Sequence, residues 1–128
     1  MAFLLVFLGG GAGSLCRFAT NGLFSKTLGW DGDGLLYSTL LVNALGSLAA
    51  GAVFFLASSG MDPSDTKRLF LMAGFCGGFT TFSGFSLEVF KMLQGGEAGK
   101  ALLYAFANVA LSVAFLAAGF CASRAALR

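Results

Sequence analysis

The sequence contains no histidine. Catalysis by a histidine general base, a histidine proton relay and metal binding through imidazole are therefore excluded for this chain. Charged residues are also scarce: Lys, Arg, Asp and Glu make up 11% of the 128 residues, and the net charge is +2. Because this charge is small and scattered along the chain, no nucleic-acid partner is expected.

Cysteine and proline are rare as well, with three and one residues respectively. Cys16, Cys76 and Cys121 lie within apolar runs, and no two of them have the CxxC spacing of metal and redox sites. We interpret them as small thiols buried in the membrane and predict neither a disulfide nor a cysteine metal site. The chain also lacks a P-loop lysine motif, and nothing in it predicts an enzyme.

Apolar residues, in contrast, are abundant. Hydrophobic side chains make up 57% of the chain and the mean hydropathy is +0.84, which is typical of an integral membrane protein. The length allows about four spans of ~20 residues. We expect one all-helical membrane domain over residues 1–128, with spans at about 2–24, 35–57, 69–90 and 100–123. No Lys or Arg precedes Arg17, so the first run lacks the positive start of a cleavable signal and is predicted to be a retained span.

The third span holds the most unusual stretch, GFCGGFTTFSGFSLEVF at residues 74–90. Its glycines and hydroxyl residues weaken a helix, and non-helical backbone at membrane depth persists only where it is buried in protein or lines a wet cavity. We therefore predict a helix that is broken near its middle and builds a site. Four residues of this span follow one another at steps of three or four, which predicts that they share one face of a helix. They are Phe75, Phe79, Phe82 and Ser86.

Isolated polar residues occur in the second and fourth spans. Asn43 is costly in hydrocarbon unless it finds a partner, and it is compatible either with a hydrogen bond between helices or with a site. In the fourth span Tyr104, Asn108 and Ser112 recur at steps of four and so lie on one side of the helix. This stripe indicates a helix contact or a water-filled path, and the polar groups of the other spans favour the path.

The first span and the end of the third carry further candidates. Gly9 and Gly13 form a GxxxG pair, which favours close helix packing over a phosphate-binding loop. Arg17 lies toward the far end of its span, where it snorkels to the interface or caps a polar vestibule. For Glu88, near the end of the third span, the simplest role is an interfacial ion pair with Lys91.

Positive charges are nearly balanced between the two ends of the predicted bundle. One side carries Lys67, Arg68, Arg124 and Arg128, and the other carries Lys26, Lys91, Lys100 and Arg17. The positive-inside rule then gives almost no preferred orientation. Copies can therefore insert both ways and pair as an antiparallel homodimer, which also suits a chain that is too small to enclose a path alone.

Four motifs carry a family resemblance: GGGAGSLCRF at 9–18, TLLVNALGS at 39–47, GFCGGFTTFSGFS at 74–86 and YAFAN at 104–108. With them the chain resembles the Fluc (CrcB) family of fluoride channels over essentially its whole length, and the third motif is the most specific. The resemblance implies a four-span, dual-topology homodimer in the bacterial cytoplasmic (inner) membrane. Two antiparallel-related pores would export fluoride passively and relieve its toxicity.

The resemblance also implies roles for single residues. Phe82 and Phe85 match phenylalanines whose ring edges line the ion path, and Asn43 matches the asparagine whose amide faces it. The other residues expected to line the pore are Thr81, Ser83, Tyr104 and Asn108, with Ser112 as a further hydroxyl donor.

The same resemblance implies a structural Na⁺ at the break, held by backbone carbonyls of Gly77 and Thr80 from both subunits. Arg17 matches the first-span arginine of the family. One departure stands out: the usual TTFSTF reads TTFSGF here, so Gly84 removes a hydroxyl from the polar track.

The chemistry of these residues suits a small, strongly hydrated anion. Ring edges are positive and amides and hydroxyls donate hydrogen bonds, so they replace water without holding the anion as tightly as a buried Lys or Arg would. The main alternative is a proton-coupled small multidrug-type transporter, which needs a carboxylate within the membrane. No Asp or Glu precedes Asp31, and Glu88 is the only acid associated with a span. A non-conducting assembly subunit is the third possibility.

Overall fold

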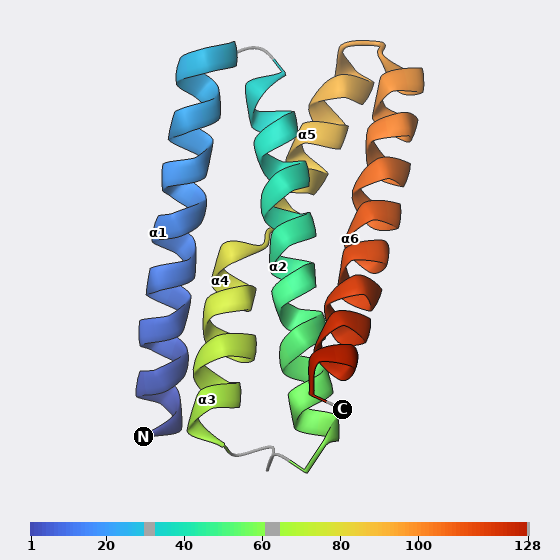
Figure 1. Ribbon diagram of the computed structural model, residues 1–128. Helices are drawn as coiled ribbons and strands as arrows, with labels where there is room; N and C mark the ends of the chain where they lie inside the picture. Colours follow the sequence, from blue (N-terminus) through green and yellow to red (C-terminus); the bar gives the residue numbers. More distant parts are fainter. Residues whose placement is uncertain (30–32, 61–64, 128) are drawn as a thin grey trace.

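The computed structural model of the protein describes residues 1–29, 33–60 and 65–127. Within these ranges all regular structure is helical, as Figure 1 shows. In chain order the elements are α1 (Ala2–Leu28), α2 (Gly34–Ser58), α3 (Thr66–Arg68), the π-helix η1 (Leu69–Cys76), α4 (Gly77–Phe79), α5 (Phe82–Gln94) and α6 (Ala98–Ala126).

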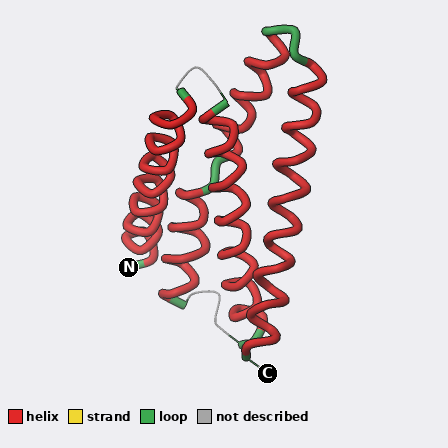
Figure 2. Tube along the Cα trace, turned by 45° about the horizontal axis from the view of Figure 1, so that its top comes forward, coloured by secondary structure: helices red, strands yellow, loops and turns green. Residues whose placement is uncertain are grey.

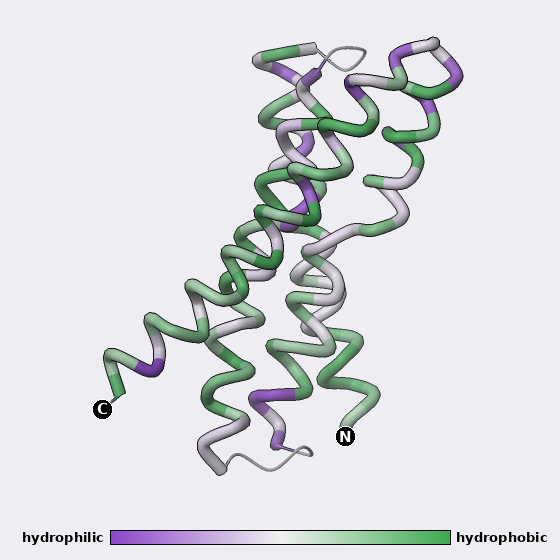
Figure 3. The backbone as a smooth tube through the Cα atoms, turned by 90° about the vertical axis from the view of Figure 1, so that its right-hand side faces the viewer, coloured by the Kyte–Doolittle hydropathy of each residue, from purple (hydrophilic) through white to green (hydrophobic). Residues whose placement is uncertain are grey.

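Four helical stretches are long and apolar enough to cross a membrane, which confirms the predicted number of spans. They are Ala2–Leu28, Gly34–Ser58, Thr66–Gln94 and Ala98–Ala126. A helix pairs most of its backbone polar groups within itself, so it can lie in hydrocarbon. Figure 3 shows hydrophobic residues along the helices, with hydrophilic residues at both ends of the bundle and a few at mid-height.

The four stretches pack as two close pairs, and the first pair is α2 against α6. A Cβ atom built on Gly51 would lie 2.0 Å from the carbonyl oxygen of Leu116, and one on Gly119 would lie 2.0 Å from that of Leu48. Each glycine thus admits the backbone of the other helix, which is how helices approach closely in membranes.

The second pair is α1 against η1 and α4. A Cβ on Gly9 would lie 2.3 Å from the carbonyl oxygen of Phe70, and one on Gly13 would lie 2.2 Å from that of Phe75. The glycines of the first span therefore form a helix-packing surface against the third stretch, as predicted.

The third stretch is interrupted at Thr80 and Thr81, which confirms the predicted break. Thr80 has ψ 158° and Thr81 has φ −146° and ψ 118°, so two extended residues separate α4 from α5. Figure 2 shows this short non-helical segment at mid-height in the bundle. The first half of the stretch accordingly packs beside α1, and the second half lies nearer α6.

Two features of this stretch differ from expectation. Leu69–Cys76 is a π-helix, in which the N–H of Gly77 reaches the carbonyl of Met72, five residues back. The single face expected for the phenylalanines and Ser86 is also wrong, because the two extended residues interrupt the helical period. Phe75 and Phe79 stack on each other before the break, with ring centroids 5.7 Å apart.

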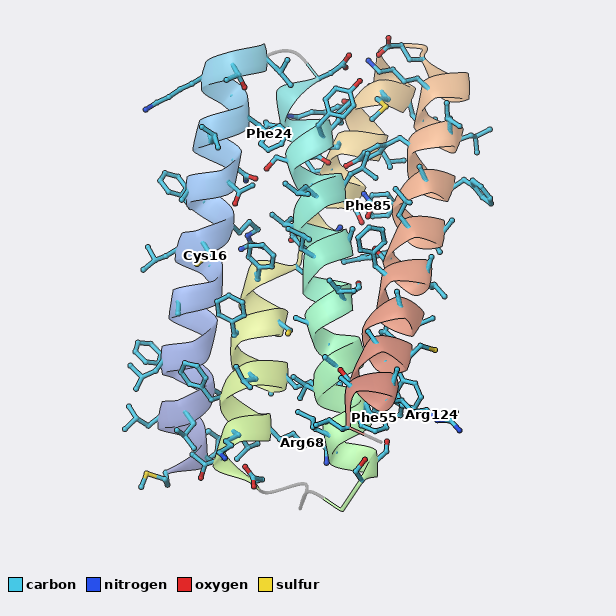
Figure 4. All side chains as sticks on the ribbon, viewed as in Figure 1. Cys16, Phe24, Phe55, Arg68, Phe85 and Arg124 are labelled. Carbon is cyan, nitrogen blue, oxygen red and sulfur yellow. The ribbon has the colours of Figure 1, made fainter. Side chains whose placement is uncertain are left out.

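Charged residues lie toward the two ends of the bundle, except for Arg17 and Glu88. Both termini share one end with Arg68 and Arg124, which Figure 4 labels. At the other end Lys100 pairs with Asp33 at 2.7 Å, and this is the only ion pair in the part of the chain that the structure describes. The near balance of positive charge between the ends therefore persists in the fold.

Much of the apolar surface is not covered by the chain itself. In the most apolar part of each span, at most 28% of the residues are buried. Large side chains along all four stretches face outward, Phe82 and Phe106 among them, with 77% and 73% of their surface exposed. This surface is suited to contact with lipid or with another subunit.

Candidate functional site at the break in the third span

Asn43 of α2 holds the break together. Its Oδ1 accepts a hydrogen bond from the Thr81 N–H at 2.8 Å, and its Nδ2 donates to the Thr81 carbonyl at 3.2 Å. Both backbone groups of an extended residue are thus paired by one side chain, as backbone at membrane depth requires. The amide is 9% exposed. It links α2 to the break and to α6, and it also borders a groove.

Hydroxyl groups complete the two helix ends at the break. The Thr81 Oγ1 accepts from the N–H of Gly84 at 3.0 Å and caps the start of α5. The Thr80 hydroxyl donates to the Cys76 carbonyl at 2.8 Å. Gly46 of α2 makes room for Thr80, because a Cβ there would lie 2.3 Å from its methyl carbon. The non-helical segment is therefore fixed from both sides.

A second amide joins this network from α6. Nδ2 of Asn43 donates to Oδ1 of Asn108 at 2.9 Å, and Asn108 is 5% exposed. The Nδ2 of Asn108 is buried and has no hydrogen-bond partner among the residues that the structure describes. A buried donor without a partner is uncommon in native proteins and calls for a ligand or water.

These residues border a groove of about 290 Å³, here called the break groove. It is lined by Asn43, Ser47, Thr80, Thr81, Phe82, Phe85, Asn108, Val109, Ser112 and Val113. Its walls are mainly apolar, with a few amides and hydroxyls and with no charged residue. Such a surface offers hydrogen-bond donors in a poorly hydrated setting.

The two phenylalanines of the groove differ in their surroundings. Their ring centroids are 5.4 Å apart, with the planes inclined by 58°. Phe85 is 8% exposed and packs against Tyr104, with centroids 5.7 Å apart, whereas Phe82 is 77% exposed. Figure 4 labels Phe85 in the half of the bundle opposite Arg68. One wall of the groove therefore stands open on the surface of the single chain.

Glu88 of α5 lies in a separate polar cluster with Thr39 of α2 and Tyr104 of α6. Thr39 donates to its Oε1 at 2.8 Å, and the Tyr104 hydroxyl donates to its Oε2 at 2.5 Å. The expected ion pair with Lys91 is not formed in the described part of the chain. The carboxylate points inward because two buried hydroxyls donate hydrogen bonds to it. These bonds stabilise it more than a solvent-exposed ion pair on one helix would.

Arg17 lies near the middle of α1, and not toward the end of the span as expected. Its Nη1 donates to the Thr80 carbonyl at 3.1 Å. That carbonyl is left open where α4 ends, so the break supplies the partner that a cation at this depth needs.

Arg17 borders a second groove of about 420 Å³, here called the arginine groove. Its lining is Ser14, Arg17, Phe18, Asn21, Thr39, Thr81, Ser83, Gly84 and Glu88. Thr81, which caps the start of α5, thus borders both grooves.

Backbone oxygens at the break suit a hard cation. Because the Thr81 N–H donates to Asn43, it does not close the helical bond to the Gly77 carbonyl. Gly77 is exposed, and a Cβ there would have no atom closer than 3.9 Å. The Thr80 carbonyl gives one lone pair to Arg17 and keeps a second. The described residues contain no group of three or more His, Cys, Asp or Glu that could hold a metal ion.

The residues predicted for one path are therefore distributed over several surfaces. Asn43, Thr81, Phe82, Phe85, Asn108 and Ser112 meet at the break groove. Ser83 borders the arginine groove, and the Tyr104 hydroxyl binds Glu88. Sequence reasoning missed Thr39 and Ser47. They lie four residues before and after Asn43, so the spacing that identified the fourth-span stripe would also have identified them.

The fold and the site together define a small integral membrane protein with four spans, the third of which is interrupted by a buried polar site. The family model "CrcB-like protein, Camphor Resistance (CrcB)" matches residues 4–120. The chain belongs to this CrcB family.

Proteins named "Fluoride-specific ion channel FluC" are similar to the chain over most of its length. The one from Thermus thermophilus is 50% identical over 115 residues, which cover 90% of this chain and 88% of the relative. Those from Rhodopseudomonas palustris and Pyrococcus furiosus are 42% and 40% identical and cover 98% and 94% of this chain, and the same shares of the relatives. The chain is thus a member of an ion-channel family of the bacterial inner membrane and is not an enzyme.

Proposed function

We propose that the protein is a passive, fluoride-selective channel that exports fluoride from the cytoplasm. The observation that carries the proposal is the break groove, an apolar cleft with no charged lining residue and with a buried amide for which the described residues provide no hydrogen-bond acceptor. The names of relatives at 40 to 50% identity support fluoride as the ion.

The groove suits an anion that must enter and leave quickly. Hydrogen-bond donors replace part of its hydration shell, and the positive edges of phenyl rings add weak attraction. A carboxylate in the lining would repel the anion, and none is present among the lining residues. The cationic side chain of Arg17 is bound to the Thr80 carbonyl and borders the other groove.

The channel is proposed to be an antiparallel homodimer with two pores. The open wall at Phe82 supports this, because a second copy would close the groove and cover the exposed ring. The balanced charge at the two ends of the bundle also supports insertion in both orientations. Each pore would then combine donors and rings from both copies.

A structural Na⁺ is proposed at the centre of the dimer. The carbonyls of Gly77 and Thr80 from each copy would hold it as hard oxygen ligands. The ion would supply positive charge that links the two breaks. Within each chain, Asn43 keeps the Gly77 carbonyl free by occupying the Thr81 N–H.

Passive conduction of fluoride is sufficient to protect the cell against fluoride toxicity. Neutral hydrogen fluoride crosses membranes and dissociates in the more neutral cytoplasm, so fluoride accumulates there and flows out through an anion channel. Energy coupling is not required for this direction of flow.

Fluoride release from liposomes that contain the purified protein tests the proposal. A channel releases fluoride rapidly without a pH gradient and in preference to chloride. A proton-coupled transporter would need the gradient, and an assembly subunit would release nothing. Liposomes without protein provide the baseline.

A further inference from the structure

A third groove is lined from α2 and α6, at the end of the bundle where both helices begin (Figure 1). Its volume is about 290 Å³, and it is here called the end groove. In the described part of the chain, none of its lining residues borders the break groove or the arginine groove. Most of its lining is apolar and includes Leu36, Tyr37, Leu40, Leu103 and Ala107. The end groove is therefore a surface that the proposed ion path does not use.

The two charged residues of the lining lie at the outer end of the end groove. Asp33 precedes the first residue of α2, and Lys100 lies in the first turn of α6. From these residues the lining continues for seven positions on each side, to Leu40 and Ala107, which is about 10 Å at the rise of an α-helix. The headgroup region of a bilayer is about 5–7 Å thick on each side. The end groove thus extends from headgroup depth into the hydrocarbon.

The charged pair is able to bind a further group that carries both signs of charge. Lys100 Nζ donates to Asp33 Oδ1 at 2.7 Å, and the two side chains are 44% and 51% exposed. Among the described residues, this bond uses one of the three ammonium N–H groups and one of the two carboxylate oxygens. Cationic donors and an anionic acceptor therefore remain side by side, above an apolar groove.

We infer that the end groove binds a zwitterionic phospholipid with a primary ammonium, of the phosphatidylethanolamine class. The lipid phosphate accepts from Lys100, the lipid ammonium donates to Asp33, and the upper part of one acyl chain lies along Leu40 and Ala107. Charge complementarity carries the inference, because each charge of the headgroup meets its opposite. The inference does not depend on fluoride conduction, so it can fail while the proposed function stands.

The headgroup must provide the selectivity for this lipid. Lipid chains are as apolar as the leucines of the groove, so any phospholipid gains equally from laying a chain there. An anionic phosphatidylglycerol brings its phosphate to a lysine that Asp33 already neutralises, and it has no cation for Asp33. A phosphatidylcholine has a cation without an N–H, so it cannot donate a hydrogen bond to the carboxylate.

Competition between lipids in native mass spectrometry tests the inference. The full-length protein in detergent is mixed with equal amounts of dioleoyl phosphatidylethanolamine, phosphatidylglycerol and phosphatidylcholine. We expect adducts of phosphatidylethanolamine to exceed each of the other two by about three- to fivefold, the scale of one exposed ion pair. Equal adducts of the three lipids overturn the inference, because the groove is then covered without selection, by any lipid or by a second copy of the chain.

Charge variants locate the headgroup. Asp33→Asn leaves Lys100 unpaired and should reverse the preference in favour of phosphatidylglycerol, whereas Lys100→Gln should abolish it. Glu97→Gln and Lys91→Gln are the matched controls, because both residues are exposed near the same end and outside the groove lining. The controls should keep the parent preference. A preference that survives Asp33→Asn, or that the controls lose equally, overturns the assignment.

A variant that fills the groove locates the acyl chain. Ala107→Phe places a ring in the end groove and leaves the charged pair intact, so the preference for phosphatidylethanolamine should disappear. Ala110→Phe is the matched control on α6, because Ala110 is exposed and lies outside the lining. Size-exclusion chromatography shows that each variant is folded. An unchanged preference in folded Ala107→Phe protein contradicts binding in the groove.

Discussion

At the scale of single residues, side chains supply the hydrogen bonds to backbone groups that a continuous helix would supply itself. Asn43 binds both backbone groups of Thr81, and Arg17 takes the carbonyl of Thr80. The sequence predicted that Asn43 needs a partner, because an unpaired amide is costly in hydrocarbon. It did not identify the partner, since that is a backbone group whose freedom depends on the break. The position predicted for Arg17 was wrong for the same reason, because its partner is the Thr80 carbonyl that the break leaves open.

The two ring residues of the groove allow a paired prediction. Phe82→Ile and Phe85→Ile should both reduce fluoride release, because an aliphatic side chain lacks the positive edge of a ring. Phe85→Ile should also lower thermal stability by about 1 kcal/mol, since Phe85 packs on Tyr104 and Phe82 is exposed. Release assays and thermal unfolding in detergent measure the two effects. Normal conduction by both variants would show that the rings have no part in the path.

Glu88 provides a test against proton coupling. Glu88→Gln keeps an oxygen for one of the two hydroxyl donors and should cost about 1 kcal/mol of stability. Fluoride release should remain independent of a pH gradient in both proteins. Release that follows the gradient in the parent chain and loses this dependence in Glu88→Gln would support the transporter alternative.

At the scale of elements, the break and the glycine contacts were predictable, whereas the π-helix was not. Glycines and threonines in an apolar run indicate interrupted helix, and GxxxG indicates close packing, because both depend on local chemistry. The π-helix and the division of the phenylalanine stripe depend on how the third stretch fits against α1 and α2. This packing depends on three elements at once, so the sequence of the third stretch alone does not predict it.

The contact of α1 with η1 gives a prediction at this scale. Gly13→Ala places a Cβ 2.2 Å from the Phe75 carbonyl, so the helices must separate, and we expect a loss of about 1–3 kcal/mol. Gly22→Ala on the same helix is the matched control, because no atom lies within 4 Å of a Cβ there. Thermal unfolding of both variants should differ clearly. Equal melting temperatures would contradict the packing described for this pair.

At the scale of the whole molecule, the open groove and the balanced charge are the two features on which the proposed pairing of opposed copies rests. The sequence predicted the balance, which follows from counting charged residues at the loops. It could not give the shape of the groove, because Asn43, Phe85 and Asn108 come from three separate helices.

Dual insertion can be measured with one introduced thiol. Gly95 follows α5 in the turn to α6 and has φ −76°, so Gly95→Cys in a background without the natural cysteines is tolerated. A membrane-impermeant thiol reagent applied to intact cells should label about half of the protein, as the absence of a charge bias implies. Complete labelling or complete protection would indicate a single orientation.

The packing of the bundle as two helix pairs, each in close contact through glycines, has a consequence for membrane insertion and assembly. Neither pair carries the whole groove lining: α2 and α6 carry the amides, while the third stretch carries the two threonines and, on α5, the two rings. A newly inserted chain whose pairs have not yet docked therefore has no continuous polar lining. Such an intermediate would lack the lining that the proposed conduction requires, so we expect it not to leak ions.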